Sequence, residues 1–150
     1  FSCHSNDKLI SLEGGPSYVG GSFDCHGCRN LISLKGAPSI VDGHFYCFGC
    51  INLTSLKGSP QSVKDFNCTS CIELTSFNEL PREINGKLTV HDLPKVKNYL
   101  SIFKIKKVML IYADDYNLQE IINKYLPTRD VIGCQDELIE AGYEQFARTK

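Results

Sequence analysis

Features that would point to a nucleic-acid or lipid partner are missing from the sequence. The 150 residues carry a formal net charge of -1, and acidic and basic side chains are mixed along the chain. No basic stripe is present that would attract nucleic-acid phosphates. The longest apolar run, 108–113, is far shorter than the roughly 18 residues that a membrane-spanning helix needs. We therefore expect neither a nucleic-acid nor a membrane partner.

Signatures of catalysis are also missing. The sequence has no G-x-S-x-G motif, no phosphate-binding loop and no H-E-x-x-H motif. The carboxylate pair Asp114–Asp115 is expected to open a helix, because acidic side chains favour the positive end of the helix dipole. Serines recur at one fixed spacing, at Ser11, Ser33, Ser55 and Ser76. We interpret them as turn residues and predict a protein that is not an enzyme and needs no cofactor.

What the sequence does contain is a 22-residue unit that repeats at least four times. Its first leucines are separated by 22, 22 and 21 residues, at Leu9, Leu31, Leu53 and Leu74. The same frame aligns the prolines Pro16, Pro38, Pro60 and Pro81. It also aligns the core positions Phe23, Phe45, Phe66 and Leu88. A fixed period in this range is typical of solenoids, in which each unit buries its apolar face against its neighbours.

The second unit shows how one repeat is expected to fold. Residues 44–48 alternate and are rich in aromatic side chains, which predicts a short strand. Period two places Phe45 and Cys47 on the inner face. The outer face then carries His44, Tyr46 and Phe48. Stacked units would form a parallel sheet with continuous inner rows of Phe, Cys, Leu and Val, so we predict an α/β repeat solenoid with short parallel strands.

The repeat resembles the leucine-rich repeat. In the third unit, Val63-x-x-Phe66-x-Cys68-x-x-Cys71-x-x-Leu74 follows the L-x-x-L-x-L-x-x-[NC]-x-x-L line of that family. The other units have one more residue between the valine and the aromatic position, which suggests a locally altered turn. The sequence pattern L-x-S-L-x-G-x-P-x-x-V-x-G-x-F-x-C is similar to that of short-repeat proteins of tailed bacteriophages and some bacteria. Parts of the segment 121–142 also resemble the C-terminal segments of these proteins. The resemblance covers about residues 1–95 and implies an architecture, but no single activity.

The chain starts inside a repeat, because Phe1 aligns with Phe23 and Cys3 with Cys25. Solenoids normally carry a polar cap at each end. We therefore expect further repeats, or a cap, before Phe1.

Three C-x-x-C pairs occur at equivalent repeat positions, and they leave three interpretations open. The pairs are Cys25/Cys28, Cys47/Cys50 and Cys68/Cys71. Their spacing falls within the range of zinc sites, and adjacent strands are close enough for disulfides. However, the fourth unit has Val90 and Leu93 at the same positions, and these side chains fill apolar sites. We favour reduced cysteines packed in rows, with no metal site, in the reducing environment of a cytoplasm.

The outer face of the predicted sheet, called the strand face below, is the candidate partner-binding surface. Most of its positions are polar, but two aromatic side chains lie two residues apart in the middle of the array. Exposed aromatic residues often anchor protein interfaces. The residues proposed to bind a partner are Tyr46, Phe48, His44, Asp24, His26 and Asn67.

The repeat pattern fades after Pro94, which divides the chain into a solenoid, 1–95, and a C-terminal segment, 96–150. Residues 107–113 predict a strand, and 117–126 predict a helix that Pro127 ends. A second helix is expected from Thr128 or Asp130 to about Arg148, with Leu138, Ile139, Tyr143 and Phe146 facing inward. We interpret this segment as a strand and two-helix cap on the last repeat.

Together these patterns predict a non-enzymatic module that binds a protein through its strand face, in the cytoplasm of a bacterium or a phage-infected cell. Two alternatives remain open. One is a structural or assembly subunit that associates with copies of itself. The other is a zinc-binding module that uses the C-x-x-C pairs. The sequence does not fix the oligomeric state.

Overall fold

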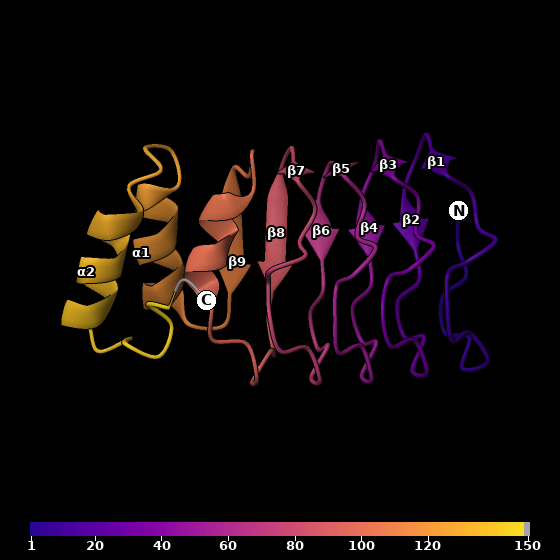
Figure 1. Ribbon diagram of the computed structural model, residues 1–150, viewed down its shortest axis with the longest axis horizontal. Coiled ribbons are helices and arrows are strands. Elements are labelled where there is room, and N and C mark those ends of the chain that lie inside the picture. The colour runs from indigo at the N-terminus through magenta and orange to yellow at the C-terminus, as the bar shows by residue number, and fades with distance from the viewer. Residues whose placement is uncertain (149–150) are drawn as a thin grey trace.

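The structure is a computed structural model that describes residues 1–148, and it shows a parallel β-solenoid capped by two helices (Figure 1). The coils lie side by side in one row, and α1 and α2 stand at the C-terminal end of that row. This confirms the predicted α/β repeat solenoid. The last two residues of the predicted cap, 149 and 150, lie outside the described residues.

Four coils contribute one short strand to each of two parallel sheets, and a further strand, β9 (Leu110–Ala113), extends one of these sheets. The larger sheet has the order β2 (Phe23–Asp24), β4 (Phe45–Tyr46), β6 (Phe66–Asn67), β8 (Lys87–Val90) and β9 (Leu110–Ala113). The smaller sheet has the order β1 (Tyr18–Val19), β3 (Ile40–Val41), β5 (Ser62–Val63) and β7 (Glu83–Ile84). In the larger sheet Phe45 pairs with Phe23 on one side and with Phe66 on the other. Strand pairing therefore joins residues that occupy equivalent positions in successive sequence repeats.

The strand predicted over 44–48 is shorter than expected. In the structure β4 covers only Phe45–Tyr46, and a turn follows. A residue with positive φ lies at the same place in five successive coils and turns the chain there. These residues are Ser5, Gly27, Gly49, Ser70 and Asp92, with φ between 52° and 70°. The predicted alternation still holds, since Phe45 and Cys47 are fully buried and Tyr46 and Phe48 are half-buried.

The core consists of rows of equivalent side chains that run along the solenoid. Phe1, Phe23, Phe45 and Phe66 stack with ring centroids 5.1 to 5.4 Å apart and planes within 12° of one another. Parallel rows of leucine, valine and cysteine fill the space beside them, and nearly all are buried. Each fully buried Phe or Leu contributes about 2 kcal/mol, but only where a neighbouring coil covers it. Stability therefore depends on stacking.

The C-terminal segment continues the solenoid before it caps it. A 3-10 helix, η1 (Tyr99–Lys104), replaces the return side of the last coil. The side chain of Asn98, which is buried, holds this coil by accepting from the Phe77 backbone N–H at 3.1 Å. The strand predicted over 107–113 begins later, at Leu110, although Lys107 bridges to Glu83 of β7.

The two helices are α1 (Tyr116–Tyr125) and α2 (Val131–Glu140). The predicted extension of the second helix to about Arg148 is wrong, because Gly142 at φ +84° ends it. The backbone N–H groups of Gly142 and Tyr143 donate to the carbonyls of Ile139 and Leu138, the pattern of a Schellman motif. Leu138 is buried as predicted, whereas Ile139 is 45% exposed.

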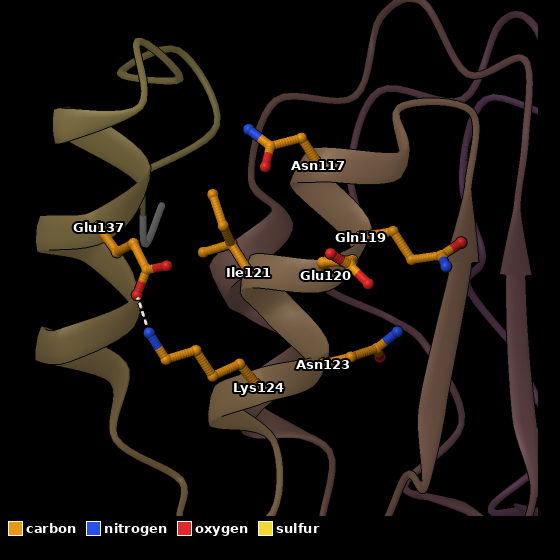
Figure 2. Close-up of a pocket in the computed structure, with 7 residues that line it drawn as sticks. All are labelled: Asn117, Gln119, Glu120, Ile121, Asn123, Lys124 and Glu137. Carbon is orange, nitrogen blue, oxygen red and sulfur yellow. Dashed lines mark hydrogen bonds and ion pairs between the residues drawn. The ribbon is translucent and has the colours of Figure 1, made fainter.

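Helix α1 closes the open edge of the larger sheet with amide side chains. Asn123 accepts from the Ile111 backbone N–H at 2.7 Å and donates to the Ile111 carbonyl at 2.9 Å. Gln119 accepts from the Ala113 N–H at 3.0 Å. Figure 2 shows both amides pointing from α1 toward β9. These two side chains provide the hydrogen bonds that a further strand would make, which protects the edge from pairing with another chain.

Replacing Asn123 with leucine is expected to destabilise the cap. The variant N123L leaves two backbone groups of β9 without their partners, and we expect a loss of about 2 kcal/mol in the free energy of unfolding. Urea unfolding followed by circular dichroism measures this loss. The matched control is N117L on the exposed face of the same helix, for which we expect a change within about 0.5 kcal/mol. Equal losses in the two variants would contradict the edge-closing role.

Candidate functional site

The register of the larger sheet brings the predicted partner-binding residues together on the strand face. Asp24, Tyr46 and Asn67 occupy one row, because Tyr46 pairs with Asp24 on β2 and with Asn67 on β6. His26 and Phe48 lie two residues further along their coils, in the next row. All five side chains, and His44 with them, are half-buried rather than exposed. The two aromatic residues are therefore partly packed against neighbours and do not protrude.

The packing partners of Phe48 form a short aromatic ladder that consists of His4, His26 and Phe48. The His4 and His26 rings stack at 4.6 Å with planes 6° apart, and His26 and Phe48 stack at 4.4 Å with planes 9° apart. Tyr46 meets Phe48 edge-on at 6.1 Å, and its other neighbour, His44, lies 5.6 Å away. The rings are held in place by one another, so the cluster is pre-organised.

Carboxylates hold three of the imidazoles on this face. His26 Nδ1 lies 2.6 Å from Asp24 Oδ1, and His44 Nδ1 lies 2.8 Å from Asp65 Oδ2. His91 Nδ1 lies 2.9 Å from Asp114 Oδ1. The sequence analysis placed Asp24, His26 and His44 on the strand face, and it assigned Asp114 to the helix start. Asp114 reaches this face because Ile111 pairs with Leu88, 23 residues earlier in the chain. This spacing is not apparent from the sequence, because the repeat pattern fades after Pro94.

Two of the predicted binding residues also shape the backbone. The backbone N–H of His26 donates to Asp24 Oδ1 at 3.1 Å, and that of Thr69 donates to Asn67 Oδ1 at 2.9 Å. These are Asx-type turns that help to end the strand. Asp24 and Asn67 therefore have structural roles, whereas Tyr46 at the equivalent position has no such group.

Strand β9 adds residues that the sequence analysis missed. Tyr112 pairs with Thr89 and thus extends the row of Tyr46, and it is 38% exposed. Lys87 Nζ lies 5.5 Å from the centre of the Tyr112 ring, a cation–π distance. An alignment of Leu88 with Ile111, both apolar, would have placed Tyr112 in this row from the sequence alone.

An acidic hollow of about 260 Å³ lies at the C-terminal side of the strand face. Asp92, Asp114 and Asp115 line it together with Lys97 and with apolar side chains that include Phe146. Asp115 caps α1, as its place before the helix predicted, by accepting from the Leu118 N–H at 3.0 Å. That N–H and the Tyr143 hydroxyl hold the pKa of Asp115 below its usual value. Asp115 is thus a structural carboxylate.

A second hollow, of about 400 Å³, lies beside α1 (Figure 2). Its polar side chains are already engaged in holding the fold. Gln119 and Asn123 bind the edge of β9, and Lys124 pairs with Glu137 of α2 at 2.5 Å. We do not interpret it as an active site.

The cysteines form rows in the core, in agreement with the predicted packing. All eight are free, and seven of them are buried. The second thiol of each C-x-x-C pair donates to the carbonyl of the preceding coil at 3.1 to 3.3 Å, which involves Cys28 and Cys3, Cys50 and Cys25, and Cys71 and Cys47. In residues 1–148, no cluster of three or more His, Cys, Asp or Glu residues has the arrangement to hold a metal ion.

Fold and site define the protein as a capped parallel β-solenoid with an aromatic cluster on its larger sheet. No family model, no curated protein and no solved structure matches the chain. The resemblance to leucine-rich-repeat and phage proteins therefore stays a prediction. Over the described part of the chain, no helix has the length and apolar character needed to cross a membrane.

Two thiols, those of Cys3 and Cys134, are expected to react slowly while the protein is folded. Burial, as the largest cause, raises the pKa of Cys3 from 9.0 to about 11 and that of Cys134 to about 12. Only the thiolate is nucleophilic, so at pH 8 we expect Cys3 to react about 100-fold more slowly with a disulfide reagent than an ordinary thiol does. The rate should rise about tenfold per pH unit up to the pKa of Cys3.

The measurement is the time course of thiol labelling at pH 7, 8 and 9, with and without denaturant. The denatured protein is the control and should label fully and quickly. Rapid labelling of the native protein at pH 7 would show that a thiolate is stabilised, and the packing interpretation of the cysteines would then be wrong.

Proposed function

We propose that this protein is a non-enzymatic, leucine-rich-repeat-like module that binds a protein partner through its strand face. The observation that carries the proposal is the pre-organised cluster of His26, His44, Tyr46 and Phe48 on an otherwise polar sheet. Rings that are already ordered lose little side-chain entropy when a partner covers them. Cluster and partner would thus form an interface with a central aromatic anchor and a polar rim.

The charges on this face favour a protein partner over a nucleic acid. Two carboxylates, Asp24 and Asp65, bind histidines of the cluster, a third, Asp114, binds His91 on the same face, and Lys87 is a basic side chain of the same rows. The carboxylates outnumber the lysine in these rows. Nucleic-acid affinity comes largely from basic side chains that neutralise phosphates, and such an arrangement would oppose it.

The proposed setting is the cytoplasm of a bacterium or of a phage-infected cell. Eight unpaired cysteines support a reducing compartment, because disulfides form readily in oxidising ones. The similarity of the repeat sequence to that of short-repeat phage proteins supports a role in which the protein acts on a host protein. No cofactor enters the proposal.

Removing the central rings is expected to abolish partner capture. We propose affinity capture from a bacterial lysate with the wild-type protein and with the double variant Y46A/F48A, quantified by mass spectrometry. Proteins that bind through the strand face should fall by about tenfold or more, because central aromatic anchors contribute 2 kcal/mol or more. Circular dichroism verifies that the variant is folded.

The matched control is Y18A/I40A. It removes one aromatic and one aliphatic side chain, 57% and 45% exposed, from the smaller sheet. Capture by this control should equal that of the wild type. If the strand-face variant captures every protein as well as the control does, the strand face is not the binding surface. If the wild type captures only copies of itself, the assembly alternative replaces the proposal.

A further inference from the structure

The aromatic ladder on the strand face is interrupted at one coil. Equivalent positions of the five successive coils carry His4, His26, Phe48, Thr69 and His91. Stacked rings occupy the first three positions, whereas the fourth has the short side chain of Thr69. The backbone continues without a break, since the Gly49 N–H donates to the Thr69 carbonyl and the Ser70 N–H to the His91 carbonyl. The interruption is therefore in the side chains alone.

The size of this gap matches one planar ring. Neighbouring parallel strands are about 4.8 Å apart, so the positions of Phe48 and His91 are roughly 9.6 Å apart along the solenoid. Rings in the ladder stack at 4.4 and 4.6 Å. One ring placed above Thr69 would thus lie at stacking distance from Phe48 and at a similar distance from the His91 position. One face of Phe48 already packs on His26, and the other face is turned toward Thr69.

The far side of the gap is held open and is acidic. His91 Nδ1 binds Asp114 Oδ1 at 2.9 Å, and Asp114 belongs to the next coil, away from Thr69. The imidazole is therefore anchored away from the gap. The other carboxylate oxygen of Asp114 accepts from the Asp92 backbone N–H at 2.6 Å. Both aspartates line the acidic hollow described above, and the Asp114 side chain is 63% exposed. The three aspartates outnumber Lys97 in the lining of this hollow, so a cation bound near the gap would be stabilised there.

We propose that the space above Thr69, between Phe48 and His91, is a slot for an aromatic side chain of the partner protein. A basic group of the same partner segment lies next to it, over Asp92 and Asp114. This deepens the proposed function, because it names the chemistry that the strand face recognises: an aromatic residue with a neighbouring positive charge. A nucleobase has a suitable shape, but its phosphate would meet the acidic hollow.

Nuclear magnetic resonance titration with small probes tests the slot without knowledge of the partner. Tryptophanamide combines an indole with a positive charge, and we expect it to shift the Thr69 methyl and Ser70 amide signals with a dissociation constant on the order of 1 mM. N-acetyltryptophan, which is an anion, and cyclohexylalanine amide, which lacks the aromatic ring, should cause about tenfold smaller shifts at equal concentration. Tighter binding of adenosine monophosphate than of tryptophanamide would overturn the proposal.

The variant T69F supplies the ring from the protein itself. We expect it to fold, to melt no lower than the wild type, and to reduce the shift of Ser70 by tryptophanamide by about tenfold. A second variant, F48A, removes one wall of the slot and should cause the same loss. Unchanged shifts in both variants would overturn the slot.

The outcomes for the slot and for the proposed function are distinguishable. Should T69F capture a strand-face partner as well as the wild type does, while Y46A/F48A does not, the slot is wrong and the binding face remains. Should tryptophanamide occupy the slot while no partner protein depends on Tyr46 and Phe48, the slot remains and the proposed function is wrong.

Discussion

Everything in this fold depends on keeping successive coils in register. A shift by one residue would turn Phe45 outward and Tyr46 inward, because side chains alternate along a strand. The same shift would separate each C-x-x-C thiol from the carbonyl that accepts its hydrogen bond. Residues with positive φ, such as Gly49 and Ser70, turn the chain at equivalent positions of five successive coils and so help to fix the phase of these coils. The in-register stacking of the coils therefore produces both the rows of side chains in the core and the rows on the surface.

A solenoid in register has open edges, and the C-terminal segment shows how one of them is closed. Asn123 and Gln119 satisfy the outer backbone groups of β9 with side-chain amides, and apolar residues of α1 cover the core behind them. The helices thus have a structural task that accounts for these side chains. Asp115 and the Lys124–Glu137 pair belong to the same task. The strand face differs from the helices in having its aromatic side chains grouped in one cluster.

The sequence predicted the parts of the structure that are periodic. A 22-residue repeat is enough to derive the parallel sheet, the inner rows and the grouping of Asp24, Tyr46 and Asn67, since identical neighbours determine each position. It did not predict the parts that depend on a single local event. Gly142 ends α2 early because its positive φ starts a Schellman motif, and the sequence allowed it equally as a weak position within a longer helix. The place of Tyr112 and Asp114 on the strand face was missed because their coil is longer and its repeat residues differ.

The strand face is distinctive where one coil differs from its neighbours. Row positions that vary between polar residues, such as Ser22 and Asp65, are tolerated because each side chain still accepts a hydrogen bond from a backbone N–H of the next coil. A ladder of rings is different, because each ring needs a neighbour at stacking distance to lose its contact with water. Phe48 has such a neighbour on the side of His26, and on the side of Thr69 it has a short side chain instead. The incomplete stack is next to fixed carboxylates, so shape and charge at this point of the surface select the same kind of ligand.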